Sequence, residues 1–162
     1  MKVRIDVYAD LVCPWCFIGF LRLNAALDST GRGGEVAIRH RPFVLHPDAP
    51  PEGLDLSTML ERKYGVESHR LFERVEAAAI DTGIRLDLSR QRRTYSTIAA
   101  HTLLRHAGER GTQHALTDSL FAAYFLRAQN IGAPDVLPQS PRGMASAPKK
   151  PPVSCTIRTS LH

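Results

Sequence analysis

The stretch "YADLVCPWCFIGFLRL", Tyr8 to Leu23, joins two different patterns of apolar residues. Before it, Val3, Ile5 and Val7 alternate with polar residues, which is the period-two pattern of a β-strand. Beyond the second cysteine, apolar residues recur at helical spacing as far as about Asp28. The pair Cys13 and Cys16 therefore lies where a strand runs into a helix.

The residues that follow predict a second strand. "STGRGG", residues 29–34, supplies glycines suited to the end of the helix and a turn. "EVAIRHRPFVL", residues 35–45, then has the composition of a strand that stops near Pro42. The order strand, helix, strand predicts a βαβ unit over residues 1–45, with the cysteines at its first strand-to-helix junction.

Beyond residue 45 the pattern changes to helices alone. Residues 46–54, "HPDAPPEGL", form a proline-rich linker. Helices are expected at about 55–64, 67–82, 94–109 and 112–129, which predicts an all-helical domain over 55–131. Residues 132–162 contain six of the eleven prolines and show no sustained period, so we expect a disordered tail there.

Composition narrows the classes of function. The chain has 162 residues, of which 43% are hydrophobic and 23% charged, an ordinary globular balance. Its formal charge of +5 is scattered, without the basic and aromatic clustering of a nucleic-acid surface. The N-terminal segment is interrupted by charges and contains no signal peptide or membrane span. We therefore expect a cytoplasmic protein with no nucleic-acid or membrane partner.

The cysteine pair fits redox chemistry. Reducing conditions in the cytoplasm argue against a structural disulfide framework. A cysteine at a helix N-terminus is favoured as a thiolate, which makes Cys13 the expected nucleophile. Cys16, almost one turn later, can displace a mixed disulfide formed at Cys13. Pro14 suits the first helical turn, and Trp15 offers an apolar surface beside the reactive sulfur.

Two other interpretations of the pair stay open. In the first, Cys13 and Cys16 form half of a zinc site, which His40 with His46, or His101 with His106, could complete. Both histidine pairs lie farther from the cysteines along the sequence than in a compact zinc finger. Alternatively, both cysteines are simply buried as small apolar side chains.

A few further residues are candidates near the thiols. Asp10 could influence proton traffic at the cysteines, although an aspartate at a strand end is more often a solvated cap. His101 could face a cleft between domains, although a helix histidine satisfied by a neighbour is the commoner case. His46 and Tyr95 are weaker candidates. Cys155 is expected to be a free exposed thiol in the tail.

These motifs resemble a known family. "DLVCPWCFIGFLRL" closely resembles the active-site segment of DsbA-like thiol-disulfide oxidoreductases, in particular the FrnE-type cytoplasmic branch. The resemblance continues in "RPFVLHPDAPPEG" (41–53), "KYG" (63–65), "STIAAHTLL" (96–104) and "LFAAYF" (120–125), and covers about residues 1–137.

The resemblance implies a thioredoxin-type fold with a helical insertion and no bound metal or organic cofactor. It makes Cys13 the attacking thiolate and Cys16 the resolving thiol, with Pro14 and Trp15 tuning the potential. The implied substrate is a protein or small-thiol disulfide, with glutathione or another thiol as a possible co-substrate. Glutathione-dependent 2-hydroxychromene-2-carboxylate isomerases and kappa-class transferases look similar, but they typically place serine at the nucleophile position.

The resemblance also raises an expectation about the C-terminal part of the chain. The family's second thioredoxin half, with its cis-proline loop, is not legible after residue 131, and we expect a truncation or frameshift near residue 138. One candidate is accordingly a non-catalytic form that retains a reactive thiol. The missing strands would leave a sheet edge open, so we expect self-association through that edge.

Overall fold

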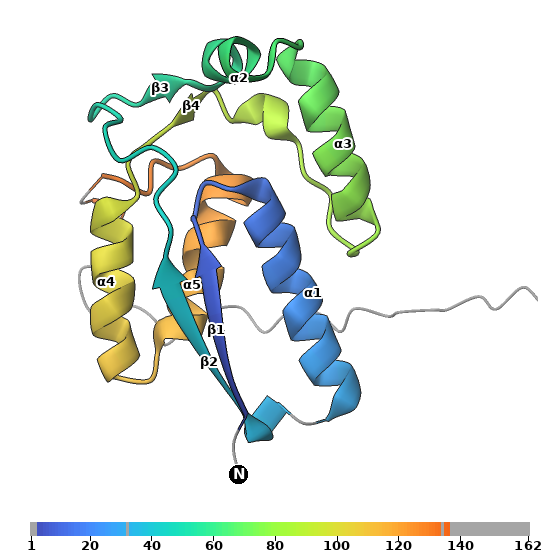
Figure 1. The fold of residues 1–162 in the computed structure, drawn as a ribbon, viewed down its shortest axis with the longest axis vertical. Helices are drawn as coiled ribbons and strands as arrows, with labels where there is room; N and C mark the ends of the chain where they lie inside the picture. The colour runs from blue at the N-terminus through green and yellow to red at the C-terminus, as the bar shows by residue number, and fades with distance from the viewer. Residues whose placement is uncertain (1–2, 32, 134, 137–162) are drawn as a thin grey trace, which may run out of the picture.

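The fold is built on two parallel strands and the helix that connects them. In the computed structural model, which describes residues 3–31, 33–133 and 135–136, strand β1 (Val3–Ala9) pairs with strand β2 (Val36–Pro42). The register runs from Val3 opposite Val36 to Ala9 opposite Pro42. Helix α1 (Pro14–Thr30) and the short 3-10 turn η1 (Gly33–Glu35) connect them (Figure 1). The βαβ unit predicted from the sequence is confirmed, with the second strand ending at Pro42.

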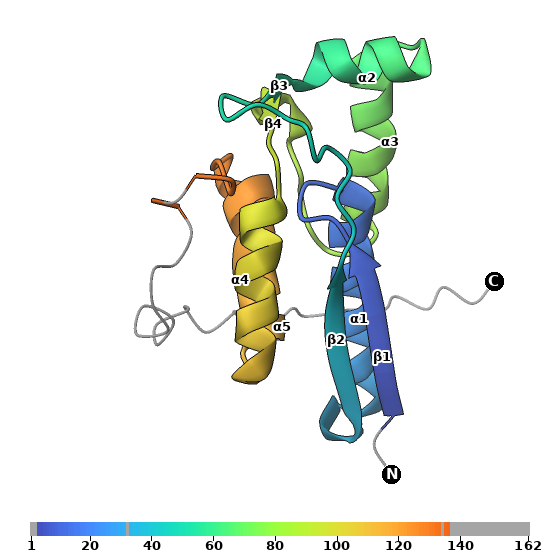
Figure 2. The same ribbon diagram turned by 60° about the vertical axis from the view of Figure 1, so that its left-hand side comes forward.

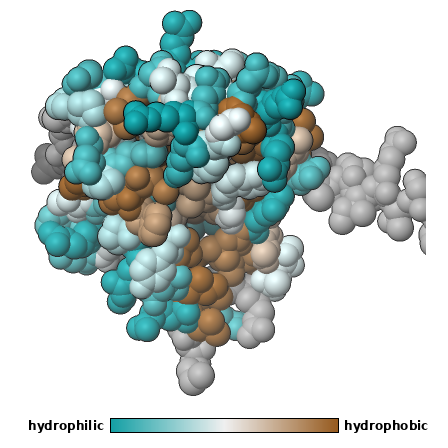
Figure 3. Space-filling model, turned by 45° about the horizontal axis from the view of Figure 1, so that its top comes forward, coloured by the Kyte–Doolittle hydropathy of each residue, from teal (hydrophilic) through white to brown (hydrophobic). Residues whose placement is uncertain are grey.

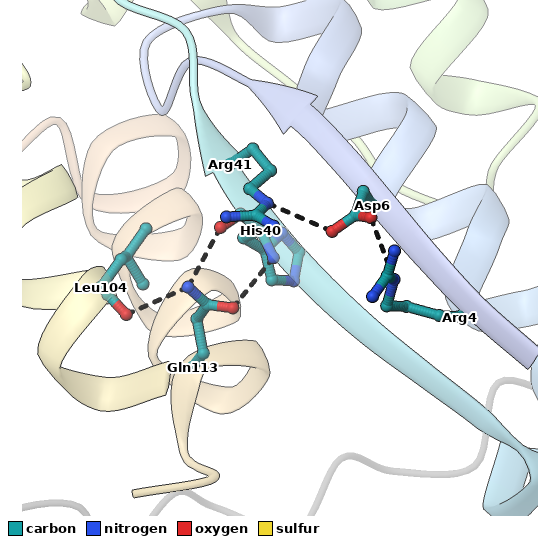
Figure 4. Close-up of polar contacts among 6 residues, drawn as sticks. All are labelled: Arg4, Asp6, His40, Arg41, Leu104 and Gln113. Carbon is teal, nitrogen blue, oxygen red and sulfur yellow. Dashed lines mark hydrogen bonds and ion pairs between the residues drawn. The ribbon is translucent and has the colours of Figure 1, made fainter. Parts of the chain in front are cut away.

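One face of this sheet is polar. Asp6 on β1 accepts from Nε of Arg4 at 3.2 Å and from Nε of Arg41, on β2, at 3.1 Å (Figure 4). These side chains are partly exposed, so water screens the pairs and each contributes little to stability. The ion pairs nevertheless suit an outward-facing surface, and on the opposite face His40 of β2 is buried.

The rest of the described chain is mainly helical. It comprises helices α2 (Leu56–Tyr64), α3 (Ser68–Ile80), α4 (Ile98–Glu109) and α5 (Gln113–Phe121), with a 3-10 turn η2 (Leu88–Arg90) and a π-helical turn η3 (Ala122–Leu126). Helices α2 and α3 lie beyond the end of β1 at which α1 begins, whereas α4 and α5 lie beside β2 (Figures 1 and 2). The helical segment thus surrounds the strand-to-helix junction that carries the cysteines.

The structure corrects the helices-only prediction for this segment. Strand β3 (Leu54–Asp55) and strand β4 (Arg93–Thr94) form a two-residue antiparallel ladder, so the helix predicted at 94–109 begins only at Ile98. Gly53 precedes β3 with φ of 79°, and a Cβ there would meet the Thr94 carbonyl oxygen at 2.7 Å. Glycine is therefore required where the two segments approach.

The last predicted helix, 112–129, is also interrupted. Helix α5 ends at Phe121, and the π-helical turn η3 follows before Ala128 adopts φ of 52°. The Tyr124 carbonyl in this turn accepts a hydrogen bond from Nε2 of Gln91, and the Tyr124 hydroxyl donates to the Arg93 carbonyl at 3.3 Å. The wider turn thus joins the end of α5 to the segment around β4.

Aromatic stacking joins α1 to α5. The Phe17 ring lies 5.2 Å from the Phe121 ring and 5.2 Å from the Phe125 ring, in stacked orientations. All three side chains are buried. Because aromatic side chains bury large areas, this stack fixes the start of α1 against the distant end of the helical segment.

A second contact, between β2 and α5, is polar. Gln113 accepts from the His40 N–H at 2.9 Å and donates to the carbonyls of His40 and Leu104, both at 3.1 Å (Figure 4). The imidazoles of His40 and His114 share a 3.0 Å hydrogen bond, and Nε2 of His114 lies 2.9 Å from Oδ1 of Asn24. Since Asn24 Oδ1 accepts, His114 donates there and accepts from His40, which requires the His114 ring to be neutral.

Part of the C-terminal segment lies outside the described residues. The tail predicted over 132–162 belongs mostly to this part, as does Cys155. Of its residues, 132–133 and 135–136 are described and form turns. Among the described residues, no helix has the length and apolarity that a membrane span needs.

The histidine contact between β2 and α5 predicts a pH-dependent stability. Burial, with the neighbouring His114, lowers the pKa of His40 to about 4. In the unfolded chain this pKa is roughly 6.5, so the unfolded state takes up the proton first as the pH falls. We expect the His40 contribution, on the order of 2 to 3 kcal/mol, to be present above pH 6.5 and lost toward pH 4.

Urea unfolding at several pH values measures this effect. The variant His40→Gln should be less stable at neutral pH and should lose less stability between pH 6.5 and 4 than the unchanged protein. His69→Gln, at an exposed position on α3, should leave the slope unchanged. Equal slopes in all three proteins would contradict the assignment.

Candidate active site

The cysteine pair lies at the N-terminus of α1. Cys13 is the residue that caps the helix, with extended backbone angles of φ −90° and ψ 114°, and Pro14 follows in the first turn. The Cys13 N–H donates to the Asp10 carbonyl at 3.2 Å, and the Cys13 carbonyl accepts from the Phe17 N–H at 3.1 Å. Both cysteines are free thiols of intermediate exposure. The pair is therefore positioned by backbone bonds on both sides and remains accessible.

The two thiols titrate in opposite directions. A hydrogen bond from the Cys16 side chain, helped by the N–H groups of Cys16 and Trp15, lowers the pKa of Cys13 to about 7 against the opposing effect of burial. The same hydrogen bond, together with burial and the Cys13 charge, raises the pKa of Cys16 far above its ordinary value. Cys13 is thus the thiolate and Cys16 the thiol that donates to it.

The two residues between the cysteines differ in exposure. Pro14 is partly buried, whereas 48% of Trp15 is exposed. Phe43 and Leu45, which follow β2, are also exposed large apolar residues. The Phe43 N–H donates to the Ala9 carbonyl at 3.1 Å, which holds this segment beside the end of β1. Figure 3 shows apolar side chains gathered in patches between hydrophilic ones on the face that it presents.

Asp10 is buried beside the thiols. Its side chain is 1% exposed, so the expectation of a solvated strand-end cap is wrong. Oδ2 accepts from the Leu45 N–H at 2.6 Å. Burial acts to raise the pKa of Asp10, but the His101 side chain, the Leu45 N–H and the Thr97 hydroxyl together lower it below the ordinary value. The group is therefore a carboxylate, and its charge opposes ionisation of both cysteines.

His101 is brought to Asp10 from the helical segment. It lies on α4, is 9% exposed, and its Nε2 is 3.5 Å from Oδ1 of Asp10. Thr97, four residues earlier, is fully buried at the start of this helix. The i, i+4 spacing of Thr97 and His101 places both on one face of a helix, which is a signal that the sequence contains. The sequence contains no signal for the contact of Asp10 with the Leu45 N–H, because that N–H is a backbone group.

The histidines considered for a zinc site have other partners. His40 bonds His114, His101 faces Asp10, and His106 lies 3.8 Å from Glu109. The pKa of His46 is lowered, mainly by burial, against the opposing effect of the Asp10 charge. Tyr95 packs against the core beside Gly53. Of the candidates outside the cysteine motif, the structure therefore brings together Asp10 and His101.

Comparisons with known proteins agree on one family. Residues 4–141 match the family model of the DSBA-like thioredoxin domain. A probable DsbA oxidoreductase from Streptomyces coelicolor superposes with a TM-score of 0.70 at 30% identity, over 80% of this chain and 57% of that one. The uncharacterised protein YwbO of Bacillus subtilis (strain 168) is 29% identical over 137 residues, 85% of this chain and 64% of the relative. The chain thus spans about three fifths of the length of these relatives.

The opposed titration of the thiols predicts selective alkylation. Iodoacetamide at about pH 6 should modify Cys13 well before Cys16, because only Cys13 has an appreciable thiolate fraction there. The rate at Cys13 should rise with pH and level off above an apparent pKa of about 7. Peptide mass spectrometry after timed quenching measures both rates. Equal and slow modification of the two cysteines would contradict the assignment of Cys13 as thiolate.

Proposed function

Because this chain belongs to the DSBA-like thioredoxin domain family, we propose that it is a thiol-disulfide oxidoreductase in which Cys13 and Cys16 cycle between dithiol and disulfide. The observation that carries the proposal is the position of two free thiols, three residues apart, at the N-terminus of α1, where the pKa of Cys13 is lowered and that of Cys16 is raised. A lowered pKa supplies the attacking thiolate near neutral pH, and a neighbouring thiol with a raised pKa stays protonated until it is needed.

The proposed exchange has two steps. The Cys13 thiolate attacks one sulfur of a substrate disulfide, forms a mixed disulfide and releases the other substrate sulfur as a thiolate. Cys16 then loses its proton and attacks the Cys13 sulfur, which forms the Cys13–Cys16 disulfide and releases the second substrate thiolate. The substrate gains two electrons and the cysteine pair loses two. The reverse sequence oxidises a dithiol substrate.

The proposed substrate is a disulfide in a protein or a small thiol compound. Exposed Trp15, Phe43 and Leu45 around the end of β1 support an apolar contact with a polypeptide. We propose no bound metal or organic cofactor, and glutathione or another thiol as the reductant that restores the dithiol. The FrnE-type branch and the cytoplasmic location stay predictions from the sequence.

An insulin-reduction assay with dithiothreitol or glutathione tests this function. Variants are made in a Cys155→Ser background, so that only the motif cysteines contribute. We expect Cys13→Ser to reduce turnover to the uncatalysed rate, and Cys16→Ser to retain alkylation at Cys13 while trapping mixed disulfides. Absence of turnover in the background protein would favour the non-catalytic alternative. A glutathione-dependent isomerase or transferase activity that survives Cys16→Ser would favour that class instead.

We also propose self-association through the edge of β1. Among the described residues, β1 pairs only with β2, and an unpaired strand edge is a template for another chain. Val3, at the start of β1, is 54% exposed. The substitution Val3→Lys should reduce association, because a charge on an edge strand opposes pairing with a second copy.

Sedimentation velocity over a dilution series measures this association. Val66→Lys is the matched control, since Val66 is 41% exposed but lies between α2 and α3. A monomer at all concentrations, or an equal effect of both substitutions, would contradict association through β1.

A further inference from the structure

We propose that His101 on helix α4 is a positioning residue that sets the reactivity of Cys13 by countering the charge of the buried Asp10 carboxylate. The inference rests on the proposed function only in taking Cys13 as the nucleophile. The helical segment thereby influences the thiol chemistry through Asp10.

The geometry places three polar groups in one buried cluster. Asp10 is 1% exposed, Thr97 is 0% exposed and His101 is 9% exposed. Oδ1 of Asp10, Oγ1 of Thr97 and Nε2 of His101 are all buried and make no direct hydrogen bond of normal length to described residues. Polar atoms of this kind are costly to leave without compensation. Their convergence from two distant segments indicates a function for the cluster.

Two hydrogen bonds hold Asp10 beside the thiols. Its carbonyl holds the Cys13 N–H, and its Oδ2 holds the Leu45 N–H at 2.6 Å. Oδ1 is consequently the carboxylate oxygen left to face His101 at 3.5 Å. A charge in a poorly solvated site acts strongly on its neighbours, so the Asp10 carboxylate disfavours the Cys13 thiolate unless a nearby group counters it.

His101 is the group placed to counter the Asp10 charge. Among described residues it is the only side chain within ion-pair distance of Asp10, and either an imidazole N–H or an imidazolium reduces the carboxylate's field. It also lines a cavity of about 780 Å³ between β2 and the helices α4 and α5. The other titratable groups around this cavity and Asp10 are Arg39, His40, Arg41, His46, Arg105, Glu109, His114 and Tyr124.

A double-mutant cycle on the alkylation of Cys13 tests the inference. His101→Met keeps a side chain of similar size without polar hydrogens, and Asp10→Asn removes the charge while an amide oxygen still accepts from Leu45. The rate with iodoacetamide is recorded from about pH 5 to pH 9 for each single variant and for the double variant, all in the Cys155→Ser background. His106→Met, at an exposed position on the same helix, is the control.

We expect opposite shifts from the two single variants. His101→Met should raise the apparent pKa of Cys13 and slow alkylation at pH 6 about three- to tenfold, since one pKa unit is a factor of ten in thiolate. Asp10→Asn should lower that pKa and accelerate alkylation. In the Asp10→Asn background, His101→Met should have little further effect, because no charge remains for it to counter.

The remaining outcomes either support the inference or overturn it. An equal slowing by His101→Met in both backgrounds would show a structural role alone, and an unchanged profile in either single variant would overturn the proposal. If His101→Met unfolds while the double variant folds, His101 is again shown to offset the Asp10 charge. If neither folds, the profile of Asp10→Asn decides, and a failure to lower the pKa overturns the proposal. These alkylation rates are independent of the insulin assay, so this inference and the proposed function can fail separately.

Discussion

The position of helix α1 is the constraint on which the site depends, and Phe17 fixes it. Phe17 lies four residues after Cys13 and stacks against both Phe121 and Phe125, more than a hundred residues further along the chain. A shift of α1 along its axis would move Cys13, and the same shift would break this stack. The start of the helix is consequently set by the packing of the whole described chain, and the thiolate at its N-terminus is presented in a fixed direction.

The π-helical turn after α5 belongs to the same constraint. Residues four apart on a regular helix share a face, but the chain here must also place Tyr124 against β4. Across this turn Phe121 and Phe125 both contact Phe17, and the Tyr124 hydroxyl reaches the Arg93 carbonyl. Burial raises the pKa of Tyr124, so this hydroxyl remains a neutral donor. An irregular helix end thereby links the aromatic stack to the short β3–β4 ladder.

What the sequence predicted depended on patterns within one segment. The alternation in β1 and the cysteine spacing at the start of α1 are local, and both led to the correct βαβ unit. The β3–β4 ladder has two residues in each strand, which is too short to show a period. The contact of Asp10 with His101 joins residues 91 positions apart by sequence number, and nothing near Asp10 in the chain distinguishes a buried aspartate from a solvated one. Sequence patterns could therefore locate the thiols and suggest Asp10 and His101 as candidates, but they could not show that these two side chains are buried and face each other.

Asp10 makes the site a compromise between architecture and reactivity. Its carbonyl and carboxylate bind the start of α1 and the segment after β2, so one buried residue closes the end of the sheet. Its charge also raises the pKa of both cysteines, against the thiolate that exchange requires. The hydrogen bond from Cys16 and the N–H groups at the start of α1 outweigh that charge at Cys13, whose pKa falls to about 7. At Cys16 the Asp10 charge instead adds to the effects of burial and of the Cys13 sulfur. The carboxylate that closes the end of the sheet therefore opposes ionisation of both thiols, and the hydrogen bond between the cysteines is what separates their pKa values.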